Sequence, residues 1–198
     1  MILFRNTSFK LPLAVLAAGL AGVISTGFLA ESAQASTICP AIGADTDCQT
    51  LITINADGSA TVTSGLNNGP YDGIEDTLLG VVNNYGSAIG SIDVSGNYIF
   101  GFDGDGQSYY TGVFYDPTGY GGPGVSFTNI DMSTYNTGTV NFAGGIATGG
   151  TAWFTLEADV NAANFKITGI APVPLPATGL LLLGGLGAMF ARKRRKSA

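Results

Sequence analysis

Short stretches of alternating apolar and polar residues, separated by turn-forming residues, run along the middle of the chain. The first two, residues 49–55 and 59–63, are β-branched and joined through Ala56-Asp57-Gly58, which is typical of a hairpin. Glycine, asparagine, aspartate, serine and proline fill the gaps between later stretches, and only residues 159–164 suggest a turn of helix. This pattern predicts an all-β fold, an antiparallel β-sandwich. The further predicted strands are residues 77–83, 88–95, 98–102, 112–115, 125–130, 139–143, 151–157 and 165–170.

The N-terminus has the pattern of an export signal. Two basic residues precede residues 11–29, an uncharged stretch rich in alanine and glycine. Ala33 and Ala35 supply the small-x-small pattern that signal peptidase requires, so cleavage is expected before Ser36. Residues 1–35 are therefore predicted to be a signal peptide, and the alternative is an uncleaved N-terminal anchor.

Near the C-terminus, an uncharged apolar run lies between a proline-containing motif and a basic cluster. Residues 173–191 would span ~28 Å as a helix at ~1.5 Å per residue, close to the ~30 Å of a bilayer core. The basic cluster should stay in the cytoplasm, which places the body of the protein across the membrane. A buried terminal helix is the alternative, but the run has no polar face of helical period. The motif is Val173-Pro174-Leu175-Pro176-Ala177, and the basic cluster is Arg192-Lys193-Arg194-Arg195-Lys196.

These C-terminal features together resemble the PEP-CTERM sorting signal, which occurs on exported proteins of Gram-negative bacteria and cyanobacteria. The family name places a glutamate where this chain has Leu175, and a Val-Pro-Leu-Pro-Ala form also occurs in the family. The resemblance implies that an exosortase, a membrane-embedded cysteine transpeptidase, removes the tail. Residues 173–198 are thus interpreted as the sorting signal of a membrane-anchored precursor whose mature form reaches the cell surface or the extracellular space.

Parts of the body, residues 36–172, also resemble small secreted proteins that carry this signal. That resemblance implies a class and a location, and it implies no activity. The segments that carry it are residues 39–40, 45–48, 69–73, 76–78, 99–106, 122–127 and 140–146.

The charge of the body narrows the range of partners. Residues 36–172 hold thirteen acidic residues against one basic residue, Lys166, a net charge near −12. Nucleic acid and anionic lipid surfaces are therefore poor partners for such a body, and no nucleic-acid partner is expected. Cations, or a basic or neutral exopolysaccharide, fit better, and the alternative is that the acidity serves solubility alone.

Two cysteines, Cys39 and Cys48, lie near the expected mature N-terminus. In an exported chain they are expected to form a disulfide. A metal site is the rival interpretation, but the chain has no histidine and no other thiol to complete it.

The lack of histidine also excludes the usual Ser-His-Asp and Cys-His catalytic sites. Pairs of carboxylates could in principle hydrolyse a glycosidic bond, but nothing in the sequence singles out one pair. The protein is therefore expected to be non-catalytic.

One acidic motif suggests a calcium site. In Asp103-Gly104-Asp105-Gly106 the acids alternate with glycines, which lets a loop wrap oxygen ligands around a hard cation. The alternative is a turn that uses Asp and Gly for their tolerance of positive φ. A second acidic loop that would complete the site contains Asp72, Glu75 and Asp76.

Tyrosines in or near glycine-rich loops are the other candidate binding residues. Exposed rings stack on sugar faces, whereas rings at the edge of a sandwich only pack. The sequence thus favours a non-catalytic surface or matrix protein, and the alternative is a calcium- or glycan-binding module delivered by the same route. The tyrosines are Tyr98, Tyr109, Tyr110, Tyr115, Tyr120 and Tyr135.

Overall fold

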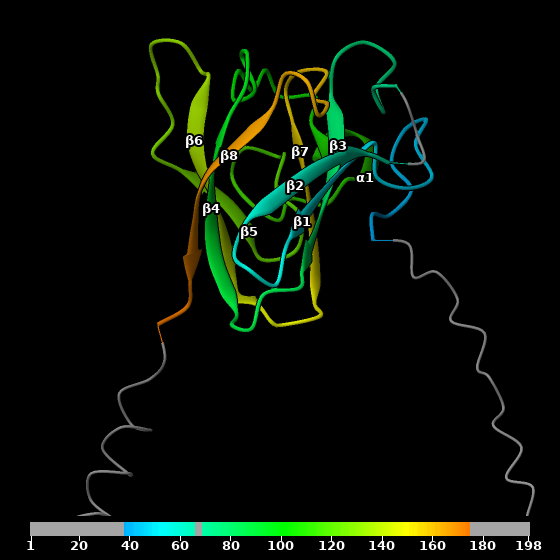
Figure 1. The fold of residues 1–198 in the computed structure, drawn as a ribbon. Helices are drawn as coiled ribbons and strands as arrows, with labels where there is room; N and C mark the ends of the chain where they lie inside the picture. The colour runs from blue at the N-terminus through cyan, green and yellow to red at the C-terminus, as the bar shows by residue number, and fades with distance from the viewer. Residues whose placement is uncertain (1–37, 66–68, 175–198) are drawn as a thin grey trace, which may run out of the picture. The chain divides into compact units, whose positions relative to one another are not determined.

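The computed structural model describes residues 38–65 and 69–174, which form eight strands and one short helix (Figure 1). The strands make two four-stranded sheets with the orders β2-β1-β3-β7 and β5-β6-β4-β8, so the predicted all-β class is confirmed. The elements are β1 (Thr50–Ile54), β2 (Ala60–Ser64), β3 (Thr77–Asn83), β4 (Ile89–Ser95), α1 (Gln107–Thr111), β5 (Val125–Thr128), β6 (Thr137–Ile146), β7 (Thr151–Leu156) and β8 (Lys166–Pro172).

The predicted hairpin is present, but one strand pair runs parallel. β1 and β2 pair antiparallel, and Asp57 closes the turn by accepting a hydrogen bond from the Ser59 amide at 2.9 Å. Thr50 is opposite Ser64 in β2 and opposite Leu79 in β3. Because β2 returns the chain to the end where β1 starts, β3 enters from that end and lies parallel to β1. The prediction of a purely antiparallel sandwich is wrong at this pair.

Two predicted strands are not strands in the structure. Residues 98–102 form a turn, because Tyr98 has a φ of 59° and the chain reverses there. Residues 112–115 follow α1, which ends where Gly112 adopts a φ of 70°. Left-handed backbone cannot continue a strand ladder, whatever the alternation of side chains. Neither the turn nor α1 was expected from the sequence.

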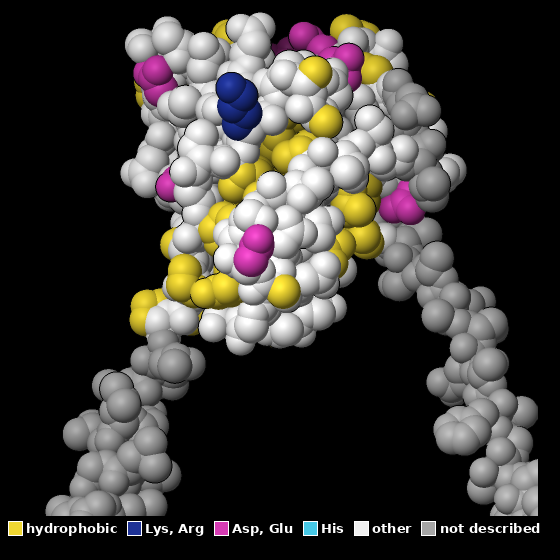
Figure 2. Space-filling view, in the orientation of Figure 1, with side chains coloured by type: hydrophobic (Ala, Val, Ile, Leu, Met, Phe, Trp, Pro, Cys, Tyr) yellow, Lys and Arg dark blue, Asp and Glu magenta, His cyan; other side chains and the backbone are white. Residues whose placement is uncertain are grey.

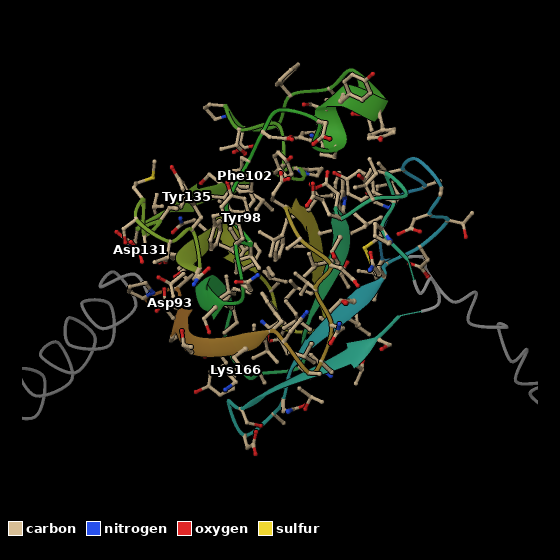
Figure 3. The ribbon with its side chains drawn as sticks, turned by 90° about the horizontal axis from the view of Figure 1, so that it is seen from above. Asp93, Tyr98, Phe102, Asp131, Tyr135 and Lys166 are labelled. Atoms are coloured by element: carbon tan, nitrogen blue, oxygen red, sulfur yellow. A yellow bond between two sulfur atoms is a disulfide. The ribbon has the colours of Figure 1, made fainter. Side chains whose placement is uncertain are left out.

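The core lies between the sheets and extends toward one end of the sandwich through a group of aromatic rings. Phe154 of β7 and Phe127 of β5 meet across the sheets with ring centroids 6.1 Å apart. The ring of Phe102 (Figure 3) packs against that of Phe127, with centroids 5.1 Å apart. It also stacks on the ring of Tyr120, with centroids 4.3 Å apart. This packing fixes the ring of Tyr120 and so the position of its hydroxyl group.

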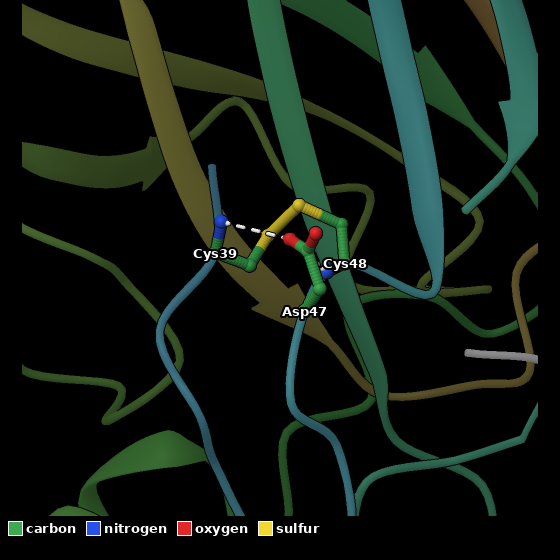
Figure 4. Close-up of a disulfide and its surroundings, with 3 residues drawn as sticks. All are labelled: Cys39, Asp47 and Cys48. Atoms are coloured by element: carbon green, nitrogen blue, oxygen red, sulfur yellow. Dashed lines mark hydrogen bonds between the residues drawn. A yellow bond between two sulfur atoms is a disulfide. The ribbon is translucent and has the colours of Figure 1, made fainter. Parts of the chain in front are cut away.

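The predicted disulfide is confirmed between Cys39 and Cys48, whose Cα atoms are 5.0 Å apart (Figure 4). Oδ1 of Asp47 accepts hydrogen bonds from both cysteine amides, at 3.3 Å from Cys39 and 2.8 Å from Cys48. The bridge covers Gly80 of β3, where a Cβ atom would lie 2.4 Å from the Cys48 sulfur. Since both thiols are oxidised, the metal interpretation of this pair is set aside.

Replacing both Cys39 and Cys48 with alanine should lower the free energy of unfolding by about 2–3 kcal/mol in the chain-entropy model. The reason is that the unfolded chain regains the freedom of a closed loop. Urea unfolding of the variant and of the reduced wild-type protein should show the same loss. An unchanged unfolding midpoint in both would contradict a stabilising role for the bridge.

Several predicted features lie outside the described residues. These are the signal peptide with its cleavage residues, the basic cluster, the apolar run beyond residue 174, and the motif residues from Leu175 onward. The first motif residue, Val173, is described, and its amide donates to the Ala88 carbonyl oxygen at 2.7 Å. Within residues 38–65 and 69–174, no helix has the length and apolar character needed to cross a membrane.

Candidate metal centre

Three segments that are distant in the sequence bring carboxylates together at one end of the sandwich. They are the loop before β3, the loop before α1 and the residue that follows β7. Figure 2 shows acidic side chains gathered at the upper edge of the molecule. The carboxylates form two trios, and within each trio the ligand oxygens lie within 4.8 Å of one another. Asp105 belongs to both trios. The trios are Asp72 with Asp76 and Asp105, and Asp103 with Asp105 and Glu157, which together we call the carboxylate cluster.

Local hydrogen bonds shape the two acidic loops. Asp72 Oδ1 accepts from the amides of Ile74 and Asp76, each at 3.0 Å, and so curls the loop before β3. In the second loop the Asp105 amide donates to Asp103 Oδ1 at 3.3 Å. Gly104 between them has a φ of 107°, which a larger residue rarely adopts. The alternation of acid and glycine therefore forms the tight turn that both sequence interpretations required.

Oxygen atoms of three carboxylates converge on a single hydroxyl group. The Tyr120 hydroxyl lies 2.9 Å from Asp105 Oδ1 and 3.4 Å from Asp103 Oδ1, and it is in close contact with Glu157 Oε2. A phenol has one hydrogen to donate, so it satisfies at most one of these oxygens well. The repulsion among the remaining carboxylates is then relieved by a proton held on one of them or by a bound cation.

Asp76 gives the clearest sign of a missing partner. Its side chain is fully buried, and its Oδ2 accepts a hydrogen bond from the Tyr71 hydroxyl at 2.6 Å. Its Oδ1 is also buried and has no hydrogen-bond partner. A buried polar atom left unpaired costs about 1–3 kcal/mol, and more when it carries charge. Asp76 also belongs to the first trio, so a cation bound there would be within its reach.

The electrostatics of the cluster follow from burial and from mutual repulsion. Burial raises the pKa of Asp76 to about 8, and the charges of Glu157, Asp105 and Asp72 add to that effect. Burial likewise raises the pKa of Glu157 and of Asp105. Hydrogen bonding from Asp105 lowers the pKa of Asp103. Three of the acids in the cluster are thus costly to ionise without a cation beside them.

No basic side chain in the described part of the chain neutralises the cluster. Lys166 is the one basic residue of the body, and Figure 3 shows it on the opposite side of the molecule from α1. The cluster contains only oxygen ligands, which hard cations prefer. Calcium takes six to eight oxygens in flexible geometry, whereas magnesium demands a near-ideal octahedron. The irregular set of five carboxylates therefore fits calcium better than magnesium.

The structure joins four of the five residues that the sequence suggested. Asp72, Asp76, Asp103 and Asp105 converge, whereas Glu75 is exposed and belongs to neither trio. Sequence reasoning missed Glu157 and the hydroxyls of Tyr71 and Tyr120. A signal for Glu157 was available, since it directly follows the apolar strand residues 151–156. An acid at that position is buried only if something compensates it.

Asp45 is a second buried acid, separate from the cluster. Its Oδ2 has no hydrogen-bond partner, and burial raises its pKa to about 6. Because the folded protein holds this proton more tightly than the unfolded chain, stability falls as the pH rises from about 4 to about 6.

Asp45→Asn should therefore stabilise the protein by roughly 1–2 kcal/mol above pH 7, after solvent screening, and by almost nothing at pH 4. Urea unfolding at both pH values checks this, and an equal gain at pH 4 would contradict it.

Comparison with known proteins gives no further guide to function. No family model, curated protein or solved structure matches the chain. The functional evidence is therefore the carboxylate cluster itself, together with its buried, unpaired oxygen.

Proposed function

We propose that this protein is an exported, non-catalytic surface module that binds calcium at the carboxylate cluster. The observation that carries the proposal is the buried Oδ1 of Asp76, which has no partner and belongs to a trio of converging carboxylates. A calcium ion would supply the missing partner and would offset the repulsion within both trios. Of the two interpretations left open by the sequence, this geometry favours a binding module over a purely structural protein.

Terbium provides a direct test, because it takes calcium sites and its luminescence is excited by nearby tyrosines. The Tyr120 hydroxyl contacts three carboxylates of the cluster, so energy transfer to a bound ion should be efficient. Titration of the full-length protein should give saturable luminescence that calcium reverses. In the double variant Asp103→Asn, Asp105→Asn the affinity should fall at least about tenfold, as expected when two charged ligands are lost.

Asp57→Asn is the matched control for the terbium titration. Asp57 is an exposed carboxylate in the β1–β2 turn, so its loss removes the same charge far from the cluster. Its titration should follow that of the wild-type protein. Equal loss of affinity in the control and in the double variant would mean non-specific attraction to a negative protein, and the calcium site would be refuted.

Delivery by the PEP-CTERM route is the second part of the proposal. It is supported by the tail motif and by the export signal in the sequence, and the disulfide suits an oxidising compartment outside the cytoplasm. The partners on this route are signal peptidase, an exosortase-type transpeptidase, and the membrane that receives the C-terminal span. The calcium site would then lie outside the cytoplasm, where calcium-binding modules typically have a Kd of about 10⁻⁴–10⁻³ M.

Intact-mass measurement of the protein recovered from cells tests this route. The mature chain should start at Ser36, because cleavage is expected after Ala35, and it should lack the basic cluster that includes Lys196. Recovery of extracellular protein that retains Lys196 would contradict removal of the tail.

Replacing the five basic residues of that cluster with neutral ones should weaken membrane retention of the precursor, since they hold its end in the cytoplasm.

A further inference from the structure

A run of exposed apolar side chains lies on α1 and on the segment that follows it. Tyr109 and Phe114 are 73% and 72% exposed, and Tyr110, Val113 and Tyr115 are more than 40% exposed. We call these five residues the aromatic ridge. Scattered exposed apolar residues are normal, but five large ones within seven consecutive residues make a candidate interaction surface.

A buried glutamine holds the backbone of the aromatic ridge in place. Gln107 is fully buried, and its Nε2 donates to the Val113 carbonyl oxygen at 2.9 Å. Its Oε1 accepts a hydrogen bond from the Thr111 hydroxyl at 3.0 Å, and the Gly112 amide donates to the Ser108 carbonyl oxygen at 2.8 Å. The ridge is thus ordered before anything binds, which lowers the entropic cost of binding.

The three tyrosine rings of the ridge contact other rings, and one of them leads to the carboxylate cluster. Tyr109 and Tyr110 meet edge to face at 5.3 Å, and Tyr115 meets Trp153 in the same way at 5.8 Å. Tyr110 packs on Tyr71 at 5.4 Å, and the Tyr71 hydroxyl donates to Asp76. One side chain therefore separates the ridge from the cation site.

Charge decides which kind of partner this surface suits. The acidic body repels anionic polysaccharides, nucleic acids and anionic lipid headgroups, and its one lysine lies on another side of the molecule (Figure 3). Tyrosine rings combine an apolar face with a hydroxyl group that hydrogen-bonds. The face of a sugar ring has the matching character, with C–H groups above and hydroxyls around its edge. A neutral, hydroxyl-rich polymer is therefore not repelled by the acidic body, and it matches the mixed apolar and hydrogen-bonding character of the tyrosines.

The outer side of the cation site is open to such a polymer. Asp103 is exposed and Asp105 is half-buried, so a calcium ion held there would face solvent on that side. Calcium accepts hydroxyl oxygens as readily as water oxygens, and it has room for more ligands than a few carboxylates supply. Two neighbouring hydroxyls of a sugar could replace two water ligands of the calcium ion, so that its number of oxygen ligands would stay the same.

We propose that the aromatic ridge and the calcium site together bind a neutral polysaccharide. The rings of Tyr109 and Phe114 stack on sugar units, while the calcium ion takes vicinal hydroxyls of the same chain as ligands. This inference rests on the proposed calcium site for its second contact only. The aromatic contact stands on the exposure and order of the ridge.

Affinity electrophoresis of the full-length protein in gels that contain dextran, mannan or hydroxyethyl cellulose tests the proposal. At least one of these polymers should retard the wild-type protein when calcium is present. The double variant Tyr109→Ala, Phe114→Ala should bind at least about tenfold more weakly, because two stacking contacts are lost. Its affinity for terbium should stay unchanged, since neither residue is a ligand. Met132→Ala, which removes a side chain 68% exposed outside the ridge, should bind like the wild-type protein.

The outcomes separate this inference from the proposed function. If no polymer retards the protein while terbium still binds, the polysaccharide proposal fails and the calcium site stands. If retardation needs the ridge but persists in EDTA and in Asp103→Asn, Asp105→Asn, the calcium contact is wrong. Ridge-dependent binding to phosphatidylcholine vesicles, or ridge-dependent dimers in solution, without retardation by any polymer would assign the surface to another partner and overturn the proposal.

Discussion

Millimolar calcium should raise the melting temperature of the protein, and the double variant Asp103→Asn, Asp105→Asn should lose that rise. On the proposed function the ion would bind the folded state, in which the carboxylates converge, and would find no comparable site in the unfolded chain. At a calcium concentration one hundred times Kd, the stabilisation is about 2.7 kcal/mol. For a domain of this size that is a shift on the order of 5–10 °C, measured by calorimetry in calcium and in EDTA.

Two controls keep this measurement specific. Asp57→Asn should retain the full rise, because the lost carboxylate lies outside the cluster. Sodium chloride at matched ionic strength should give only a small rise, since screening acts on all exposed charges alike. A rise of the same size in all three proteins, reproduced by salt, would identify general screening and would exclude a site.

Local turn chemistry made some elements predictable from the sequence. The β1–β2 hairpin was expected from Ala56-Asp57-Gly58, and in the structure Asp57 closes the turn and Gly58 has a φ of 84°. The parallel pairing of β1 with β3 was not predictable, because it depends on how a connection outside any hairpin enters the sheet. Residues 98–102 alternate like a strand, yet the left-handed backbone at Tyr98 turns them toward the core. Tertiary packing overrides alternation at such positions.

Part of the candidate site was likewise predictable from the sequence, and part was not. The spacing of Asp103 and Asp105 with glycines is local, and the sequence shows it directly. Glu157 lies fifty-four residues from Asp103 in the chain, and only the packing of β7 beside the loop brings the two together. Tyr120 was placed among loop tyrosines, whereas its ring is fully buried and stacks on Phe102. A contact made through the core leaves no spacing pattern in the sequence.

The cluster also illustrates a cost that a binding site imposes on its fold. Asp76 is buried among other acids, and one of its oxygens has no partner. Buried carboxylates are normally paired or coordinate metals, and local rules of this kind are broken chiefly at functional sites. The proposed calcium ion would relieve this cost by pairing the buried oxygen.

Asp76→Asn should consequently have opposite effects on stability with and without calcium. In EDTA at pH 7 the variant should be more stable than the wild-type protein by roughly 1–3 kcal/mol. The reason is that the wild-type carboxyl, with its pKa raised to about 8, must hold a proton against its ordinary pKa and leaves one buried oxygen unpaired. The amide oxygen can still accept from the Tyr71 hydroxyl, and its NH₂ group can donate to Asp72 or Asp105. In calcium the order should reverse, since the variant loses a charged ligand. Melting curves of both proteins in EDTA and in calcium measure this crossing, and a variant that is less stable in both media would show that Asp76 is structural and not a calcium ligand.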